Sequence, residues 1–169
     1  KNYYLSLIKK CNMIRGFVFI TLSMLVACKN KNRLPSAAVN EKIVLMQTDK
    51  AFSEMSIQKG MKAAFIEYID SNGVLLKPNQ LPIVGASAID YLVGQNDTSF
   101  TLNWQPHNAF VSKSADLGYT YGVYALHPKY ADTILYGTYV SIWKKQGDGR
   151  WKFVLDSGNE GIDSTITDF

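Results

Sequence analysis

Residues 116–152 read DLGYTYGVYALHPKYADTILYGTYVSIWKKQGDGRWK, and this stretch decides the fold. Tyr, Trp, Val and Thr dominate it, as in β-strands, and turn residues interrupt it. Gly147-Asp148-Gly149, between Trp143 and Trp151, is a strong hairpin signal. The stretch therefore predicts consecutive antiparallel strands joined by short turns.

The same pattern continues toward the N-terminus, so four strands are expected, over residues 100–113, 117–127, 134–146 and 151–156. Gly118, Gly122 and Gly137 fall inside these strands. Glycine within a strand often marks a bulge or a bend, so the sheet is expected to curve.

The segment before the strands has a helical period. Leu45, Thr48, Phe52 and Met55 fall on one face of a helix that Asn40 can cap. A second apolar stripe over residues 61–68 ends at a turn over 70–73, so a strand is expected over 74–76.

A third helix is expected over residues 88–93, because Ser87 and Asp90 resemble a capping box and Gly94 can end the helix. Three helices followed by a strand meander predict an α+β domain whose sheet curls over the helices.

The composition suits one globular domain, with 169 residues of which 47% are hydrophobic and 19% charged. The formal net charge of +4 comes entirely from Lys1, Lys9, Lys10 and Arg15. From Cys28 onward, 14 Lys or Arg balance 14 Asp or Glu. The part of the chain after the N-terminal basic residues therefore has no net charge. Binding to the phosphates of a nucleic acid needs a surplus of basic residues, so a nucleic-acid partner is not expected.

The N-terminal region predicts export. An apolar run from Phe17 to Val26 follows Arg15 and is too short to span a bilayer as a mature helix. Leu25-Val26-Ala27-Cys28 resembles a bacterial lipobox, where a signal peptide over residues 1–27 would be cut and Cys28 lipidated. A plain signal peptide or an anchor helix is the alternative.

Residues 1–12 have two interpretations, an extended charged region or translated sequence upstream of a start at Met13. A flexible tether is expected over 28–39 and the folded domain over 40–169. These features predict an exported protein, lipid-anchored in the bacterial cell envelope on its periplasmic or outer-surface side.

The order of elements and several local strings resemble the NTF2-like superfamily and, within it, the DUF4440 family, which is related to the SnoaL-like proteins. The resemblance covers residues 44–158, and its strings include residues 49–53, 104–106, 116–122, 137–145 and 149–152. It implies a cone-shaped α+β roll, with three N-terminal helices packed on a curved antiparallel sheet around a pocket, and a homodimer formed through the sheet. The superfamily holds both enzymes and binding modules, so the fold alone assigns no function.

The ketosteroid isomerases of this superfamily place an Asp base near a Pro after the second helix. The matching stretch here reads Leu75-Leu76-Lys77-Pro78, with Lys77 where that base is expected and no acidic neighbour. The steroid-isomerase mechanism is therefore doubtful. Lys77 could act as a base only if desolvation lowered its pKa, and a solvated surface lysine is the more ordinary role.

No metal or cofactor is expected. His107 and His127 are the only histidines, each stands beside a proline, and neither has a cluster of carboxylates near it in the sequence. Cys11 and Cys28 are the only cysteines, so the mature domain has no disulfide and no cysteine nucleophile.

The candidate ligand-binding residues are aromatic. Strand alternation puts Tyr119 and Tyr121 on one face, and if that face meets the helices they line a pocket with Tyr68 and Trp104. The alternative is that these rings only fill the core. Two acids at strand ends, Asp116 and Asp156, are weak catalytic candidates, with capping or turn roles as the alternative.

These observations predict a membrane-anchored lipoprotein that binds a small apolar or aromatic ligand, or a partner, in its pocket without catalysis. One alternative is an isomerase, cyclase or hydrolase of the SnoaL or ketosteroid-isomerase kind that uses pocket Asp and Tyr residues. The other is a structural or partner-binding dimer with a filled core.

The lipidation of Cys28 is directly testable. Changing Cys28→Ala removes the thiol that accepts the lipid, so metabolic labelling with a fatty-acid analogue should disappear and an uncut precursor should accumulate. Equal labelling of the variant and the natural chain would contradict the lipobox interpretation.

Overall fold

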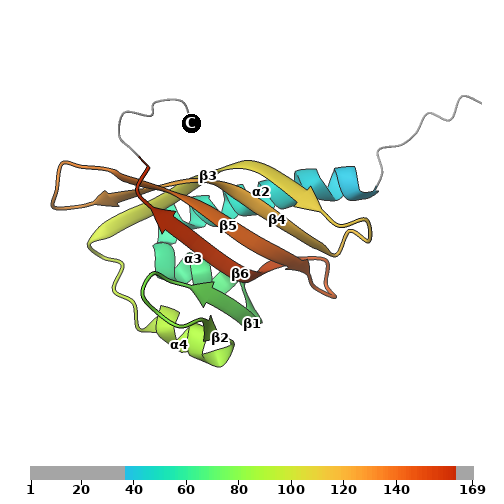
Figure 1. The fold of residues 1–169 in the computed structure, drawn as a ribbon, viewed down its shortest axis with the longest axis horizontal. Coiled ribbons are helices and arrows are strands. Elements are labelled where there is room, and N and C mark those ends of the chain that lie inside the picture. The colour runs from blue at the N-terminus through green and yellow to red at the C-terminus, as the bar shows by residue number, and fades with distance from the viewer. Residues whose placement is uncertain (1–36, 163–169) are drawn as a thin grey trace, which may run out of the picture. The chain divides into compact units, whose positions relative to one another are not determined.

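The computed structural model describes residues 37–162, so Cys28 and the predicted signal peptide lie outside the described part. Figure 1 shows the arrangement of the elements. In chain order they are α2 (Ala37–Lys59), α3 (Met61–Tyr68), β1 (Ile69–Leu76), β2 (Ile83–Val84), α4 (Ala86–Val93), β3 (Phe100–Val111), β4 (Leu117–Pro128), β5 (Leu135–Lys145) and β6 (Trp151–Glu160).

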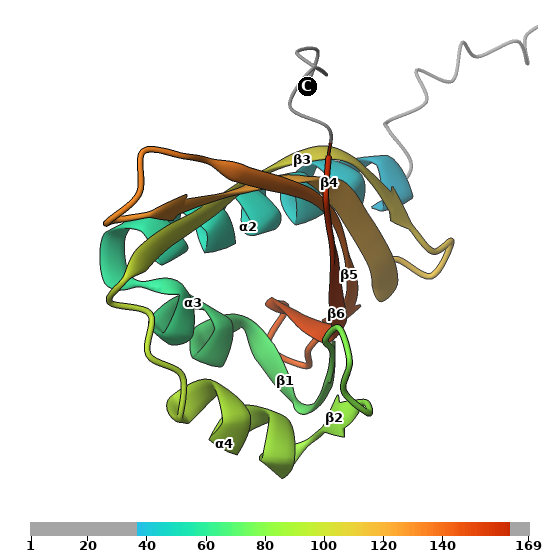
Figure 2. The ribbon, with the colours of Figure 1, turned by 60° about the vertical axis from the view of Figure 1, so that its left-hand side comes forward.

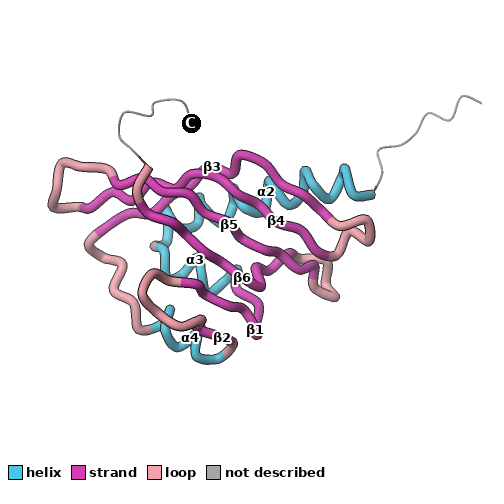
Figure 3. The backbone as a smooth tube through the Cα atoms, in the orientation of Figure 1, coloured by secondary structure: helices cyan, strands magenta, loops and turns pink. Residues whose placement is uncertain are grey.

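The predicted α+β architecture is confirmed, with three helices packed on one curved sheet (Figure 2). Helix α2 packs mainly along β3, α3 packs against α2 and β6, and α4 packs against β1 and β2. The sheet has the strand order β2-β1-β6-β5-β4-β3, with β3 to β6 forming the predicted meander (Figure 3).

The expectation of an all-antiparallel sheet is wrong at one pair of strands. Strand β1 runs parallel to β6, with Val74 opposite Leu155, and the register shifts between Ile69 and Val74. Strand β1 follows helix α3 directly and is not joined to β6 by a hairpin turn, which would force the two strands to be antiparallel. The sheet is therefore mixed.

The curvature predicted from the strand glycines is present. The register between β3 and β4 shifts between Pro106 and Asn108, opposite Gly122. A Cβ atom on Gly122 would lie only 2.1 Å from the Gln105 carbonyl oxygen, so the backbones approach there as only glycine allows. Pro106 is tolerated because β3 is an edge strand.

The start of α4 differs from the predicted capping box. The N-cap is Gly85, with a φ of 59°, and no side chain caps the helix. The backbone has a positive φ at this position, which glycine adopts at no steric cost. The Ser87 hydroxyl therefore does not cap the helix.

Helix α2 buries a stripe that is partly polar. The side chains that face the sheet are Leu45, Asp49, Phe52, Ser53 and Ser56. The apolar period identified Leu45 and Phe52 correctly, whereas Thr48 and Met55 are only half-buried at the edges of the stripe. The three polar residues are buried because each has a hydrogen-bond partner on the sheet.

Aromatic rings form the centre of the core. The Phe52 ring lies 4.5 Å from that of Trp104, 4.8 Å from that of Phe65 and 5.6 Å from that of Phe153. These edge and stacked contacts join α2 and α3 to both halves of the sheet. Within residues 37–162, none of the helices combines the length and apolar composition that crossing a membrane requires.

A matched pair of substitutions on α2 tests this packing. Leu45 is 0% exposed and Ile57 is 55% exposed, and their side chains are isomers. Leu45→Ala should lower the free energy of unfolding by about 2–5 kcal/mol, because it leaves a cavity against the sheet. Ile57→Ala should stay within about 0.5 kcal/mol in the same urea titrations. Equal losses would contradict the assigned inner face of α2.

Candidate functional site

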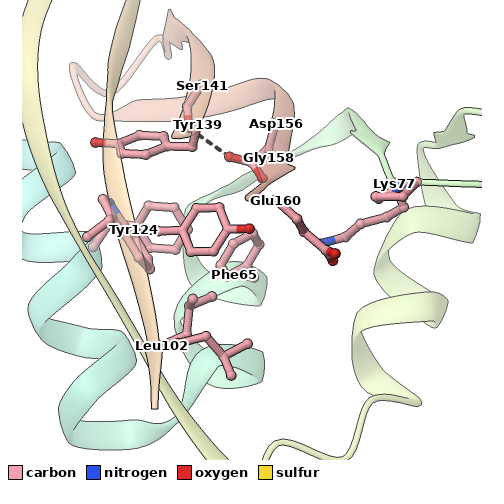
Figure 4. Close-up of a pocket in the computed structure, with 13 residues that line it drawn as sticks. Phe65, Lys77, Leu102, Tyr124, Tyr139, Ser141, Asp156, Gly158 and Glu160 are labelled. Carbon is pink, nitrogen blue, oxygen red and sulfur yellow. Dashed lines mark hydrogen bonds between the residues drawn. The ribbon is translucent and has the colours of Figure 1, made fainter. Parts of the chain in front are cut away.

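A cavity of about 200 Å³ lies between the inner face of the sheet and helices α2 and α3 (Figure 4). Residues from helices, strands and the end of β1 line it. They are Phe52, Phe65, Lys77, Pro78, Leu102, Trp104, Tyr124, Leu126, Tyr139, Ser141, Asp156, Gly158 and Glu160.

Most of the wall is aromatic. Phe52 and Phe65 come from the helices, and Trp104, Tyr124 and Tyr139 come from three successive strands. The Trp104 and Tyr139 rings lie 6.2 Å apart, edge to face. Such a wall gives the cavity an aromatic lining, which suits a small apolar ligand.

One carboxyl group, that of Asp156, is half-buried in this wall. The Ser141 hydroxyl donates a hydrogen bond of 2.7 Å to Asp156 Oδ2. Burial raises the pKa of Asp156 to about 6, while the Ser141 hydrogen bond and the Lys77 charge act in the opposite direction. This carboxyl group therefore changes its charge near neutral pH, as acid–base groups in enzymes do.

A second carboxyl group, that of Asp49, lies fully buried behind the aromatic wall. The Trp104 indole Nε1 donates to it at 2.8 Å and the Tyr139 hydroxyl at 2.7 Å. Burial raises the pKa of Asp49, and the Tyr139 and Trp104 hydrogen bonds partly offset that rise. Burial and the Asp49 charge also raise the pKa of Tyr139, so its hydroxyl stays protonated and donates.

Two oppositely charged side chains, Lys77 and Glu160, also line the cavity. Lys77 is half-buried just after β1, and Glu160 is exposed at the end of β6 (Figure 4). Lys77, expected from the sequence to be an ordinary surface lysine, is thus part of the cavity wall. It acts on Asp156 through its charge.

The predicted site residues divide into two groups. Trp104 and Asp156 line the cavity. Tyr68 does not: its ring stacks on Phe52 at 4.8 Å and borders a separate surface groove. Tyr119 and Tyr121 lie on the outer face of the sheet, 40% and 37% exposed.

The orientation predicted for β4 is therefore wrong, and the reason is steric. The inner positions of this strand pass close to α2, where a Cβ on Gly118 would lie 2.8 Å from a Leu45 methyl carbon. Thr120 also faces inward, and its hydroxyl accepts a hydrogen bond of 2.8 Å from the Trp143 indole. Gly118 and Thr120 occupy the crowded inner face beside α2, and Tyr119 and Tyr121 point outward; Tyr124, farther along the strand, faces inward and lines the cavity.

Asp116 has a turn role. It is exposed between β3 and β4, where the hydroxyls of Ser112 and Ser114 donate to its Oδ1. The hydrogen bonds from Ser114 and Ser112 lower the pKa of Asp116. It lies outside the cavity wall, so the structure separates it from Asp156.

The histidines do not meet. The His107 ring lies 5.8 Å from that of Tyr121, on the outer face. Among residues 37–162, no three His, Cys, Asp or Glu side chains gather closely enough to hold a metal ion.

The sequence patterns did not predict four residues of the site: Asp49, Tyr124, Tyr139 and Ser141. One signal for Asp49 was present, because it lies four residues after Leu45 and three before Phe52, on the same helix face. An acid within an apolar stripe requires a buried partner. The strand residues carried no comparable signal.

No family model matches the chain, and no curated protein matches it. Solved structures match in shape. An NTF2-like protein of unknown function from Pseudomonas putida matches with a TM-score of 0.61 at 11% identity, over 75% of this chain and 90% of that one. A ketosteroid isomerase-like protein from Erwinia carotovora atroseptica matches with a TM-score of 0.56 at 14% identity, over 72% and 97%.

A nuclear transport factor 2-like superfamily protein from Salmonella enterica serovar Typhimurium also matches, with a TM-score of 0.59 at 12% identity, over 75% of this chain and 94% of that one. The predicted NTF2-like fold is confirmed by these matches.

The raised pKa of Asp156 predicts a pH-dependent stability. An unfolded Asp has a pKa near 3.9, so between about pH 4 and 6 the folded state holds more protons than the unfolded state. The free energy of unfolding should therefore fall as the pH rises through this window. Asp156→Asn keeps an acceptor for Ser141 and should remove a decrease of up to about 3 kcal/mol, since a shift of one pKa unit corresponds to about 1.4 kcal/mol.

Urea titrations at several pH values between 4 and 8 measure this difference. Asp49 is present in both the natural chain and the variant. The contribution of Asp156 is therefore the difference between their two pH profiles of the free energy of unfolding. Parallel pH profiles for the two proteins would contradict the raised pKa.

Proposed function

We propose that the domain binds a small organic molecule in the cavity between the sheet and the helices. The observation that carries the proposal is a half-buried carboxyl group, Asp156, set in a wall of aromatic rings. The rings would contact the apolar body of the ligand, and Asp156 with Ser141 would contact a polar group on it. Few polar groups among many apolar ones are typical of ligand pockets.

The size of the cavity limits the ligand. Its volume of about 200 Å³ is below the roughly 300–1,000 Å³ of pockets for drug-sized molecules. We therefore expect a ligand with one or two rings. A filled core without a ligand, the structural alternative, would not need this volume.

The second candidate function is proton transfer by Asp156. A general base works best when its pKa is near the operating pH, and the pKa of Asp156 is about 6. The Ser141 hydrogen bond holds the carboxyl group in one orientation. This arrangement favours the enzyme alternative more than the sequence did, with the base on β6 and not at Lys77.

We also propose that the chain is a lipoprotein of the DUF4440 type that forms a homodimer. The lipobox ending at Cys28 supports the anchor. Exposed apolar side chains on the outer sheet face, including Phe110, Leu117 and Tyr119, support a second copy as the partner. Stable homodimers bury roughly 2,000 Å² or more, so sedimentation at micromolar concentration should give the dimer mass.

A cavity-filling substitution tests the binding proposal. A Cβ on Gly158 would lie 3.4 Å from the Tyr124 ring, in ordinary contact, so Gly158→Leu should extend into the cavity. It should weaken calorimetrically measured binding of 2-naphthol, a neutral two-ring probe, by about tenfold or more, since loss of apolar contacts of this size exceeds roughly 1.4 kcal/mol.

Gly147→Leu is the matched control, because a Cβ there meets nothing within 4 Å. It should leave the affinity unchanged. An affinity for 2-naphthol that Gly158→Leu leaves unchanged would contradict the proposal.

The enzyme candidate predicts that the protein exchanges the α-protons of 1-phenylpropan-2-one for deuterium in heavy water, which nuclear magnetic resonance measures. Asp156→Asn should slow this exchange by about 10²–10⁴-fold if the carboxylate is the base. Exchange at the rate of buffer alone in the natural chain would leave binding as the function.

A further inference from the structure

We infer that the ligand is a small organic cation, an amine joined to an apolar or aromatic body, whose ammonium group binds Asp156. The inference rests on the proposed function and names the chemical class of its ligand. Three properties of the cavity carry it: an acceptor with no partner, a negative net charge and an aromatic wall that no lysine ammonium group covers.

The first property is the incomplete hydrogen bonding of Asp156. Ser141 donates to Oδ2, and within residues 37–162 no other hydrogen bond or ion pair reaches this carboxyl group. Oδ1 therefore has an unused acceptor in the cavity wall (Figure 4). A carboxylate in such a place is best satisfied by a charged N–H donor, because charge-assisted hydrogen bonds are the stronger ones.

The second property is the charge of the lining. Lys77 contributes one positive charge, and Asp156 and Glu160 contribute two negative charges when both are ionised. Burial raises the pKa of Tyr124 and of Tyr139, so both phenols stay neutral. The net negative charge favours entry of a cation over an anion.

The third property is the absence of a cation on the aromatic wall. In the described part of the chain, lysine ammonium groups lie over only the Phe110 and Trp151 rings, and neither ring lines the cavity. The wall therefore has no cation of its own among the described residues. A desolvated ammonium group gains further stabilisation from aromatic faces.

The ligand alternatives fit less well. A carboxylate ligand would approach both Asp156 and Glu160 with only Lys77 to attract it. A neutral ligand would bind the rings but would leave the ionised Asp156 half-buried with only the Lys77 charge to balance both it and Glu160.

Three probes of the same shape and different charge test the inference: 2-phenylethylamine, 2-phenylethanol and phenylacetate, each titrated by calorimetry at pH 7.5. The amine should bind the natural chain about tenfold or more tightly than the alcohol, because a hydrogen bond to a charged group contributes at least that much. Phenylacetate should bind more weakly than the alcohol.

Two substitutions assign this difference to the charges of the cavity. Asp156→Asn should lower the amine affinity about tenfold and the alcohol affinity by clearly less, and an unchanged circular dichroism spectrum shows that the variant is folded. Lys77→Met should raise the amine affinity and lower that of phenylacetate. Asp90→Asn, on the exposed face of α4, removes the same charge outside the cavity and should change none of the three.

Equal affinities for the amine and the alcohol, or an amine affinity that Asp156→Asn leaves unchanged, would overturn the inference. The proposed function would still stand if 2-naphthol bound the natural chain and Gly158→Leu blocked it. If 2-naphthol and all three probes failed to bind, both the inference and the proposed function would be overturned.

Discussion

The arrangement of the domain depends on one buried carboxyl group, that of Asp49. It accepts hydrogen bonds from Trp104 on β3 and Tyr139 on β5, and so joins helix α2 to two strands. Removing any of the three partners would leave buried polar groups unpaired, at a cost of about 1–3 kcal/mol each. Because Trp104 and Tyr139 are also walls of the cavity, the same bonds that hold the helix place the site.

Two serines on the same buried face of α2 as Asp49 form hydrogen bonds with the edge strand of the sheet. The Ser53 hydroxyl accepts from the Trp104 backbone N–H, and the Ser56 hydroxyl donates to the Leu102 carbonyl. These backbone groups belong to β3, the last strand of the sheet, and would otherwise be free to pair with another chain. Helix α2 therefore stabilises this edge with side chains in place of a further strand.

Local patterns were sufficient to predict the three helices and the four long strands, because the hairpin at Gly147-Asp148-Gly149 and the alternation within strands act over a few residues. They missed β2, and they predicted a turn over 70–73 where β1 already runs. They could not predict which face of β4 points inward. Alternation separates Tyr119 from Thr120 but does not say which one meets α2. Of the candidate site, Trp104 and Asp156 were predicted, whereas Asp49 and Tyr139 meet across 90 residues of chain, a distance that no local pattern spans.

The parallel pairing of β1 with β6 has a consequence for how the protein is made. Strand β1 is synthesised before most of the sheet, yet its long partner is the last strand, with Leu75 opposite Asp156. As the chain emerges from the ribosome, β1 has only the short β2 to pair with in the sheet. Contacts this distant in sequence form slowly. In a nascent chain the long edge of β1 therefore stays unpaired until β6 has been made.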